Sequence, residues 1–405
     1  MIKFGKWVVK FRIPILILSF LLLIPTGIIY MNTRINYDIL SYLPGDIETM
    51  KGQDILLDEF GTGAFSVAVI DGMQEKEISQ LEDKLKEIDH VKDVLWYGAL
   101  ADISIPMDML PDDLKDSLQN ADTGSQLMII TFDTSMSADE TLDAIEEIRG
   151  LTNEQCLLSG MSAVVTDIKK ICNSEVIMYV VIAAGLSALV LALTMDSFLL
   201  PFIFLLSIGM AIVYNLGTNF IAGEISFVTQ ALAAVLQLAV TMDYSIFLWH
   251  SYLENQERYP DDRKRAMSHA ISQTLTSVVG SSITTIAGFL AMCFMTFTLG
   301  MDLGVVMAKG VVFGVIGCVT ILPSMILAMD KWIEKTRHKA IIPDLGRIGG
   351  FVTKHYWIFI ILFLVIIGPA FYGQNHNQVY YDLMGTLPDL SLIHISEPTR
   401  LALIS

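Results

Sequence analysis

The chain has few cysteines, four in 405 residues, and no two of them form a Cys-x-x-Cys pair. Without such a pair we expect neither a zinc site nor a redox centre, although a disulfide between Cys156 and Cys172 stays open. The sequence also lacks the Walker nucleotide loop, the His-Glu-x-x-His zinc motif and the Gly-x-Ser-x-Gly hydrolase motif. We therefore predict that the protein is not an enzyme and that it holds no metal and no cofactor.

Positive charge is scarce, because 26 Lys and Arg stand against 43 Asp and Glu, a net charge of −17. The imbalance is concentrated in residues 32–173, which hold 10 basic and 28 acidic residues. An acidic domain repels phosphate backbones, so nucleic acid is excluded as a partner.

Long apolar runs, in contrast, are abundant, and 53% of the residues are hydrophobic. A helix needs roughly 20 apolar residues to cross about 30 Å of hydrocarbon. Seven runs meet this requirement: 13–31, 176–195, 198–216, 226–249, 271–295, 304–329 and 356–373. They predict an α-helical polytopic protein of the cell membrane. The first run has basic flanks and no small-residue cleavage site after it, which predicts a retained anchor.

Clusters of basic residues mark the cytoplasmic loops of membrane proteins. Such clusters occur at 3–12, 258–265 and 331–347, and seven spans place all three on one side. We therefore expect a cytoplasmic N-terminus (1–31 with the first span) and an external domain at 32–173. The linker 330–355 is predicted to be either an amphipathic helix on the inner membrane surface or a solvated connection.

The external segment has the alternating strand and helix patterns of a soluble α/β domain. Strands are predicted at 65–71, 91–97, 127–133 and 157–160, and helices at 75–88 and 137–148, the second capped by Ser137. This order is that of the ferredoxin-like split βαβ fold. Residues 98–125 interrupt it as either a substrate-contacting flap or a capping insertion. The bundle then continues through 174–329.

The beginning of the chain recurs without a gap at an offset of 344 residues. Tyr37-Asp38, Leu43-Pro44, Gly5 and Lys10 match Tyr381-Asp382, Leu387-Pro388, Gly349 and Lys354. Transporters are commonly built from such duplicated halves. Residues 356–389 are thus predicted to begin a second unit. We attribute the repeated Tyr-Asp and Leu-Pro pairs to folding, in a strand that enters the external domain. Residues 390–405 do not continue the repeat and are predicted to be a foreign tail.

Asp243 lies inside the apolar run 226–249 and is followed by Tyr244. A carboxylate in mid-membrane costs about 2.5 to 3.5 kcal/mol on insertion scales, and such residues usually serve ion or proton pathways. We predict that Asp243 and Tyr244 form a proton relay. The alternative is a structural acid that is hydrogen-bonded to a neighbouring helix.

The segment Asp243-Tyr244-Ser245-Ile246-Phe247-Leu248 resembles the D-Y-x-x-F-L motif in the fourth span of the resistance-nodulation-division (RND) superfamily, in its MmpL-like branch of hydrophobe and amphiphile exporters. The resemblance implies a six-helix unit with an external porter domain. It also implies a second Asp-Tyr pair in the tenth span, which the offset puts near position 587 (243 plus 344), beyond residue 405. We therefore expect this chain to be a truncated N-terminal half.

Other polar residues of the spans are candidate neighbours of the relay. They are His250, Lys309 and the cluster Ser281, Ser282, Thr284 and Thr285. Each of them has an alternative to a role in the relay. For His250 the alternative is a histidine at the membrane interface, and for Lys309 it is a side chain that extends to the outer interface towards Asp302. For the Ser and Thr cluster the alternative is that these residues serve only as small residues that let helices approach closely. Gln230 and Gln237 are predicted to bond between helices.

These observations favour an exporter of membrane lipids or other amphiphiles that is driven by the proton gradient, with sodium as the alternative coupling ion. Its partner is expected to be the missing half or a second copy. Two rivals stay open: a lipid-binding scaffold of the sterol-sensing kind that does not transport, and an auxiliary of protein export similar to SecD and SecF.

Overall fold

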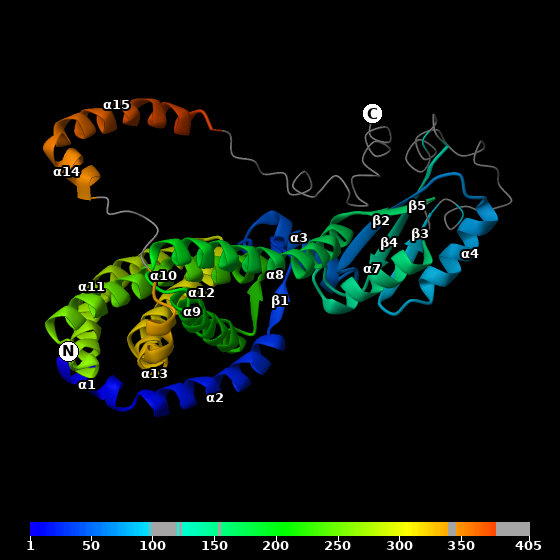
Figure 1. The fold of residues 1–405 in the computed structure, drawn as a ribbon. Coiled ribbons are helices and arrows are strands. Elements are labelled where there is room, and N and C mark those ends of the chain that lie inside the picture. Colours follow the sequence, from blue (N-terminus) through cyan, green and yellow to red (C-terminus); the bar gives the residue numbers. More distant parts are fainter. Residues whose placement is uncertain (97, 99–119, 121–123, 153–154, 339–345, 378–405) are drawn as a thin grey trace.

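The computed structural model describes residues 1–96, 98, 120, 124–152, 155–338 and 346–377, which form a helix bundle joined to a small α/β domain (Figure 1). Seven helical segments are long and apolar enough to cross a membrane. They are α2 (Arg12–Met31), α8 (Met161–Thr194), α9 (Leu200–Gly217), α10 (Phe227–Arg258), α11 (Arg263–Met292), α12 with α13 (Leu299–Ile316 and Leu322–Lys335), and α15 (Tyr356–Asn375). The predicted polytopic helical fold is thus confirmed.

A short helix that we did not predict, α1 (Ile2–Lys10), precedes the first span and packs against α11. The contact is close, because a Cβ atom on Gly5 would lie 2.3 Å from the carbonyl oxygen of Ser268. Only glycine leaves room for this approach. Helix α11 begins at Arg263, several residues before the predicted run, and the Asp262 side chain caps it by accepting the backbone N–H of Arg265.

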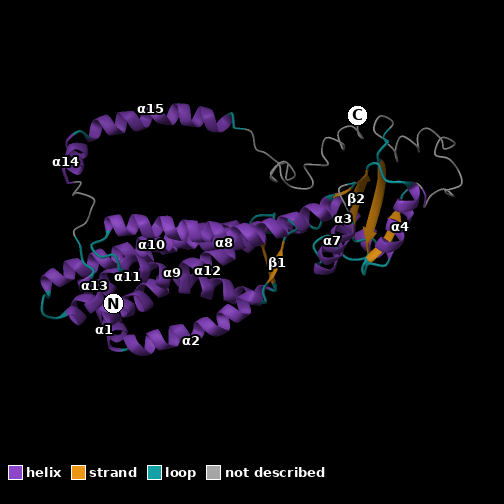
Figure 2. Cartoon of the chain, turned by 45° about the vertical axis from the view of Figure 1, so that its right-hand side comes forward, coloured by secondary structure: helices purple, strands orange, loops and turns teal. Residues whose placement is uncertain are grey.

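The same pair of helices occurs again at the end of the described chain, as α14 (Gly346–Lys354) and α15. Three helix ends lie 344 residues from their counterparts: Lys10 and Lys354, Arg12 and Tyr356, Met31 and Asn375. The repeat is therefore structural. No residue of α15 is buried, and α14 and α15 lie apart from the bundle in both views (Figure 2).

The α/β domain contains a four-stranded antiparallel sheet in the order β3-β4-β2-β5. Its elements are β2 (Ala64–Ile70), α4 (Glu75–Lys86), β3 (Val91–Leu95), β4 (Gln126–Phe132), α7 (Asp139–Leu151) and β5 (Cys156–Ser159); a helix α3 (Glu48–Asp58) precedes them. Apolar residues of α4 and α7 share one core with the sheet. This is the predicted split βαβ arrangement.

One detail of the domain differs from expectation, and the open question of a disulfide is answered. Helix α7 begins at Asp139, so its N-cap is Ala138 and not Ser137. No side chain forms a capping hydrogen bond there. All four cysteines are free. Cys156 is buried under the sheet, and this burial raises the pKa of its thiol to about 11. Most of the predicted insertion at 98–125, the repeated pairs at 381–388 and the tail at 390–405 lie outside the described residues.

The domain and the bundle share α8, a continuous helix of 34 residues. Its first turns belong to the domain, where the Ser162 hydroxyl donates to the Phe65 carbonyl (3.1 Å) and Arg149 of α7 pairs with Asp167 (2.6 Å). The predicted boundary at residue 173 therefore falls inside a rod about 50 Å long, visible in Figure 1 as the helix that leaves the bundle for the sheet.

A second connection contains the repeated Tyr-Asp pair. Strand β1 (Arg34–Asn36) pairs in parallel with β6 (Glu224–Ser226), just before α10. The Tyr37 hydroxyl donates to Asn173 of α8 (3.0 Å), and its ring stacks on Phe227 of α10. The pair thus follows β1 and lies outside the domain sheet. Our prediction of a strand entering the domain is wrong here, because the contacts of Tyr37 are with the helices.

Asp38 and Tyr42 complete this junction. The Asp38 carboxylate accepts the backbone N–H of Leu40 (2.8 Å) and begins a 3-10 turn, Leu40–Tyr42. The carbonyl of Tyr42 then accepts both the N–H and the hydroxyl of Thr298, at 3.0 and 2.9 Å, just before α12. The motif therefore ties the exit of α2 to three other spans.

Substitutions at Asp38 test this account. Burial raises the pKa of its carboxyl, only partly offset by the hydrogen bonds from Leu40 and Ser41. The stability that this shift contributes is present below the unfolded pKa of about 3.9 and lost as pH rises through the folded pKa. Asp38→Asn keeps the acceptor, so we expect it to be more stable than wild type at pH 8 and equal at pH 3. Asp38→Ala removes the acceptor, so we expect it to be less stable than Asp38→Asn by about 1 kcal/mol at both pH values. Thermal unfolding in detergent measures both differences, and an Asn advantage that did not change with pH would contradict the assignment.

The predicted linker 330–355 is divided by the structure. Residues 330–335 are the last turns of α13, where Asp330 and Glu334 pair with Arg263 of α11. They belong to the bundle because these ion pairs fasten them to it. Residues 346–354 form α14, and residues 339–345 lie outside the described part.

Candidate functional site on the fourth membrane helix

Helix α10 holds Asp243 near the middle of its 32 residues. Its start is fixed by Asp302 of α12, whose carboxylate accepts the N–H of Ser226 (2.9 Å) and the hydroxyl of Thr229 (2.6 Å). The Ser226 hydroxyl also accepts the N–H of Val228 and so caps the helix. We refer to this end as the domain end and to the opposite end, which bears the basic loops, as the basic end.

One face of α10 packs closely on α12 through glycines. A Cβ atom on Gly314 would lie 2.8 Å from Thr241, and one on Gly310 would lie 3.0 Å from Gln237. Gln237 accepts a hydrogen bond from Asn215 of α9 (3.0 Å), and all three polar side chains are buried. Small residues opposite hydrogen-bonded polar ones are the usual means of joining helices in a membrane.

The sixth span departs from α-helical geometry beside Tyr244. Residues Gly317–Ile321, between α12 and α13, form a π-helical turn. The Cys318 thiol within it donates to the Tyr244 carbonyl (3.3 Å). Tyr244 itself is buried in the bundle core. Such turns occur rarely and are frequent at functional sites, so the backbone next to the Asp-Tyr pair is locally irregular.

Asp243 is on the opposite face of α10 and is exposed. Leu236, Ala239, Phe247 and His250 are exposed with it, and their spacing of three to four residues makes one continuous stripe along the helix. Within the described residues Asp243 makes no hydrogen bond and no ion pair. The predicted alternative, an acid bonded to a neighbouring helix of its own unit, therefore has no contact to support it.

Helix α11 extends this exposed face. Gln273 accepts hydrogen bonds from Ser251 (2.8 Å) and Asn255 (2.6 Å) of α10, which sets the register of the two antiparallel helices. Asp243 precedes Ser251 by eight residues, and Ser281 follows Gln273 by eight residues, which is about 12 Å along each helix. Because the helices are antiparallel, both steps lead in the same direction, so Asp243 and Ser281 lie at the same depth in the membrane.

The predicted hydroxyl cluster of α11 surrounds that depth. Ser281 and Thr284 are exposed, and the hydroxyls of Thr284 and Thr285 donate to the Ser281 carbonyl at 2.7 and 3.2 Å. Ser282 is buried, and its hydroxyl has no partner among the described residues. Nothing within 4 Å would meet a Cβ atom on Gly280 or Gly288. The structure thus places small and hydroxyl side chains beside Asp243 without a direct bond to it. We call the stripe of α10 and these residues of α11 the open face.

The remaining predicted residues lie elsewhere. Lys309 of α12 donates to Asn219, after α9, at the domain end. Lys309 precedes Gly310, which contacts Gln237 of α10 and therefore lies at the same depth. Gln237 is six residues before Asp243, so Lys309 is about 10 Å nearer the domain end than Asp243. Gln230 donates to the Tyr30 hydroxyl of α2 (2.9 Å). Both predicted glutamines therefore bond between helices.

Several residues of this site escaped the sequence analysis. Asn215 and Thr241 are polar positions inside apolar runs, a signal that could have found them. The π-turn and the Gln273 contacts depend on which helices become neighbours, and no local pattern reveals that.

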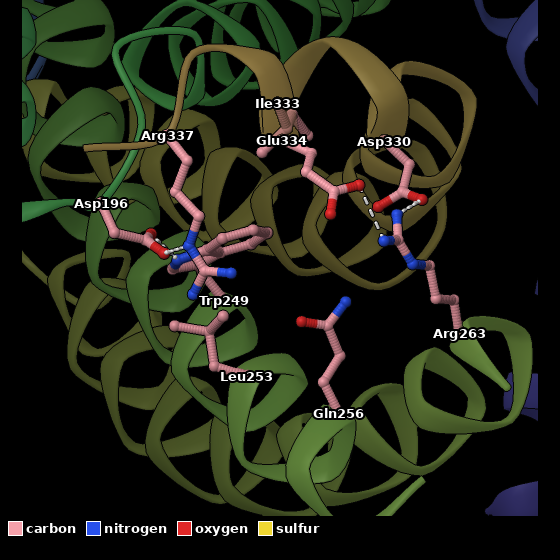
Figure 3. A pocket seen from close by; sticks show the side chains of 9 residues that line it. All are labelled: Asp196, Trp249, Leu253, Gln256, Arg263, Asp330, Ile333, Glu334 and Arg337. Carbon is pink, nitrogen blue, oxygen red and sulfur yellow. Dashed lines mark hydrogen bonds and ion pairs between the residues drawn. The ribbon is translucent and has the colours of Figure 1, made fainter. Parts of the chain in front are cut away.

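Ion pairs close the basic end of the bundle (Figure 3). Arg263 reaches Asp330 and Glu334, the latter at 2.8 Å. Arg337 pairs with Asp196 (3.0 Å), which also accepts the indole N–H of Trp249 (2.9 Å). The space between them is about 40 Å³, room for a few water molecules. We interpret this cluster as a fastening of the helix ends, not as a binding site.

A larger cavity of about 470 Å³ lies at the domain end. The surface that its lining exposes is mostly apolar, and its polar residues are Tyr42, Thr218, Asn219, Glu224, Thr298, Asp302 and Lys309. A space with mostly apolar walls and polar groups at fixed positions is typical of small-molecule sites.

Comparisons with known proteins agree with this architecture. The model of the MMPL family matches residues 61–355. The membrane protein SCO5905 of Streptomyces coelicolor is 25% identical over 295 residues, which are 68% of this chain and 35% of that protein. MmpL12 of Mycobacterium tuberculosis, named as a transport protein, is 24% identical over 299 residues, 70% of this chain and 24% of that protein.

A crystal structure of SecDF aligns with a TM-score of 0.42 at 13% identity, over 80% of this chain and 39% of that one. The chain thus spans well under half the length of these proteins. Because the family model covers most of the sequence and the seven candidate membrane helices are present, the chain belongs to the MMPL family of multi-pass membrane proteins, within the RND superfamily.

Proposed function

We propose that this chain is one unit of a pump that exports lipids or other amphiphiles and is driven by the proton gradient. The observation that carries the proposal is Asp243, an acid in the middle of a membrane helix that has no partner in its own described unit. Such a residue is costly in lipid unless it faces protein or a wet pathway. The open face is therefore the contact for a second six-helix unit, either the second repeat or another copy.

Protonation of Asp243 at that contact would change the charge at the centre of the membrane. Each charge that crosses gains about 2.3 kcal/mol per 100 mV. Helix α10 would pass a shift to α12 through the close contacts at Gly310 and Gly314. Helix α12 is bonded in turn to Tyr42 through Thr298, at the junction from which the chain enters the α/β domain. This gives a contiguous route from the acid to the domain.

The domain-end cavity suits an amphiphile as substrate. Apolar side chains would take the lipid tail, while Lys309 and Glu224 offer charged groups to a polar head. The cavity lies where the bundle meets the domain, so a molecule could enter from the membrane surface. This supports lipids over water-soluble substrates.

Dissipation of ion gradients tests the energy source. In cells that express the protein and are loaded with fluorescent lipids or amphiphilic dyes, we expect a protonophore to stop export and replacement of sodium by choline to leave it unchanged. Loss of export on sodium removal alone would assign the drive to sodium. Export that is unchanged by both treatments would contradict ion coupling. Absence of export from intact cells would favour the alternative of a lipid-binding scaffold that does not transport.

We also propose that the domain is external and that the basic end faces the cytoplasm, because basic loops are retained inside. Exposed positions on the two sides test this orientation. An impermeant maleimide is expected to label Glu87→Cys in intact cells and Lys335→Cys only after permeabilisation. The reverse pattern would invert the topology.

A further inference from the structure

A third cavity, of about 890 Å³, lies at the basic end between α1, the start of α2 and the start of α11. Its lining is strongly cationic. The positive side chains are Lys6, Lys10, Arg12, Lys264 and Arg265, with His269 beside them and Asp262 as the one acid. Neither the proton pathway nor the domain-end cavity uses any of these residues.

The five cations of this basic cavity differ from three arginines at the same end. Arg258, Arg263 and Arg337 each pair with a carboxylate. Over the described part of the chain, none of the five has such a partner. The carboxylate of Asp262 accepts the Arg265 N–H (2.9 Å) as the cap of α11. Five like charges around one space repel each other unless an anion is present, and the N-terminus of α11 adds to the positive potential.

The remaining walls are apolar and lie at the membrane surface. Ile2, Val9, Ile13 and Pro14 line the cavity, and Arg12 is the first residue of the membrane helix α2. Trp7 on α1 and Phe11 directly after it are exposed as well. Aromatic residues beside basic ones are typical of helices that lie at the membrane interface. A ligand here would meet cations and apolar groups together, at headgroup depth.

The site is held in shape by packing within the protein. The close contact of Gly5 with Ser268 fixes α1 against α11. The Arg265 guanidinium lies 4.5 Å from the centre of the Tyr259 ring, which stacks on His269. The walls thus do not depend on a ligand to bring them together, as is usual for binding sites.

We propose that this cavity binds the headgroup of an anionic phospholipid from the leaflet at the basic end. The phosphate lies among the lysines and arginines, and the glycerol and first methylenes lie along Ile2 and Ile13. Basic pockets between membrane helices recognise acidic lipids in this way. A soluble phosphate would use the same cations but not the apolar walls, so lipid is the better match. The inference is independent of the proposed export function.

Native mass spectrometry of the full chain, released from nanodiscs that contain equal phosphatidylglycerol and phosphatidylcholine, tests the proposal. We expect phosphatidylglycerol to be retained preferentially. The triple variant Lys6→Gln, Lys10→Gln, Lys264→Gln is expected to lose this preference by about tenfold or more. The matched control Lys3→Gln, Lys331→Gln, Lys335→Gln removes the same charge at the same end outside the cavity and is expected to retain it.

Three outcomes would overturn the proposal: no preference in the wild type, equal loss in the control, or displacement of the lipid by inorganic phosphate at matched concentration, which would indicate a free-phosphate site. Thermal unfolding in neutral detergent shows whether the cavity variant is folded. The lipid preference of the wild type and the competition with phosphate need no variant. They can therefore still overturn the proposal if the cavity variant does not fold.

Discussion

Replacement of Asp243 by Asn is expected to abolish export while the protein stays at its normal abundance in the membrane. The amide is nearly the same size as the carboxyl, so the packing of α10 is preserved, but it cannot take up or release a proton near neutral pH. Abundance is not expected to fall, because a neutral amide in mid-membrane costs less than a carboxylate. Export of labelled lipid by cells with equal amounts of each protein is the measurement.

Glu254→Gln is the matched control for this variant. Glu254 is an exposed acid further along the same stripe of α10, paired with Arg258 near the helix end. We expect its export to stay near the wild-type level. A membrane-soluble carbodiimide, which reacts with protonated carboxyls, is expected to label α10 in the wild type and in Glu254→Gln but not in Asp243→Asn. Unchanged export by Asp243→Asn would remove the basis of the proton relay and leave the scaffold and protein-export rivals standing.

Gly314→Leu is expected to destabilise the bundle strongly. Even a Cβ atom at this position would lie 2.8 Å from the Thr241 side chain, which is buried and β-branched and cannot move aside. Overpacking of this kind costs typically about 1 to 3 kcal/mol. We expect the melting temperature in detergent to fall by several degrees. The variant would also lose the Gly314–Thr241 contact through which α12 is coupled to α10.

Gly280→Leu provides the comparison at the same residue type in a neighbouring helix. Nothing lies within 4 Å of the position that a Cβ atom would take there, and leucine is a better helix former than glycine. The stability of this chain is therefore expected to stay the same or rise. If a second unit covers the open face, however, Gly280→Leu is expected to impair export despite normal stability. Equal destabilisation by both variants would mean that the open face is already packed within this chain.

The helices and the domain order follow from local patterns, which is why they could be predicted. Seven apolar runs give seven membrane helices, because a helix satisfies its backbone hydrogen bonds within one run and each run is long enough to cross the bilayer. The succession of strands and helices along the domain follows from local alternating and helical patterns in the same way. The amphipathic helix α1 was missed because its nine residues are too few for a clear periodic signal, although its repeat at α14 was visible as matching glycines.

The candidate site was predicted only in part. Asp243, Tyr244 and the hydroxyl cluster of α11 could be named because polar residues stand out in apolar runs. Their orientation could not be derived, since a helix buried on several sides has no single polar face. Lys309 illustrates the limit: its sequence position alone did not show that Asn219, from the turn after another span, would be its partner.

The sequence by itself determined the number of spans, the repeat of 344 residues and the presence of one acid in mid-membrane, because hydropathy and covalent order are local properties. Only the tertiary structure decided which face Asp243 occupies, which glycines join α10 to α12, and which cations gather around a cavity that has Asp262 as its one acid. Those facts depend on contacts between residues far apart in the chain, and packing of whole helices, not the preference of any one segment, sets such contacts.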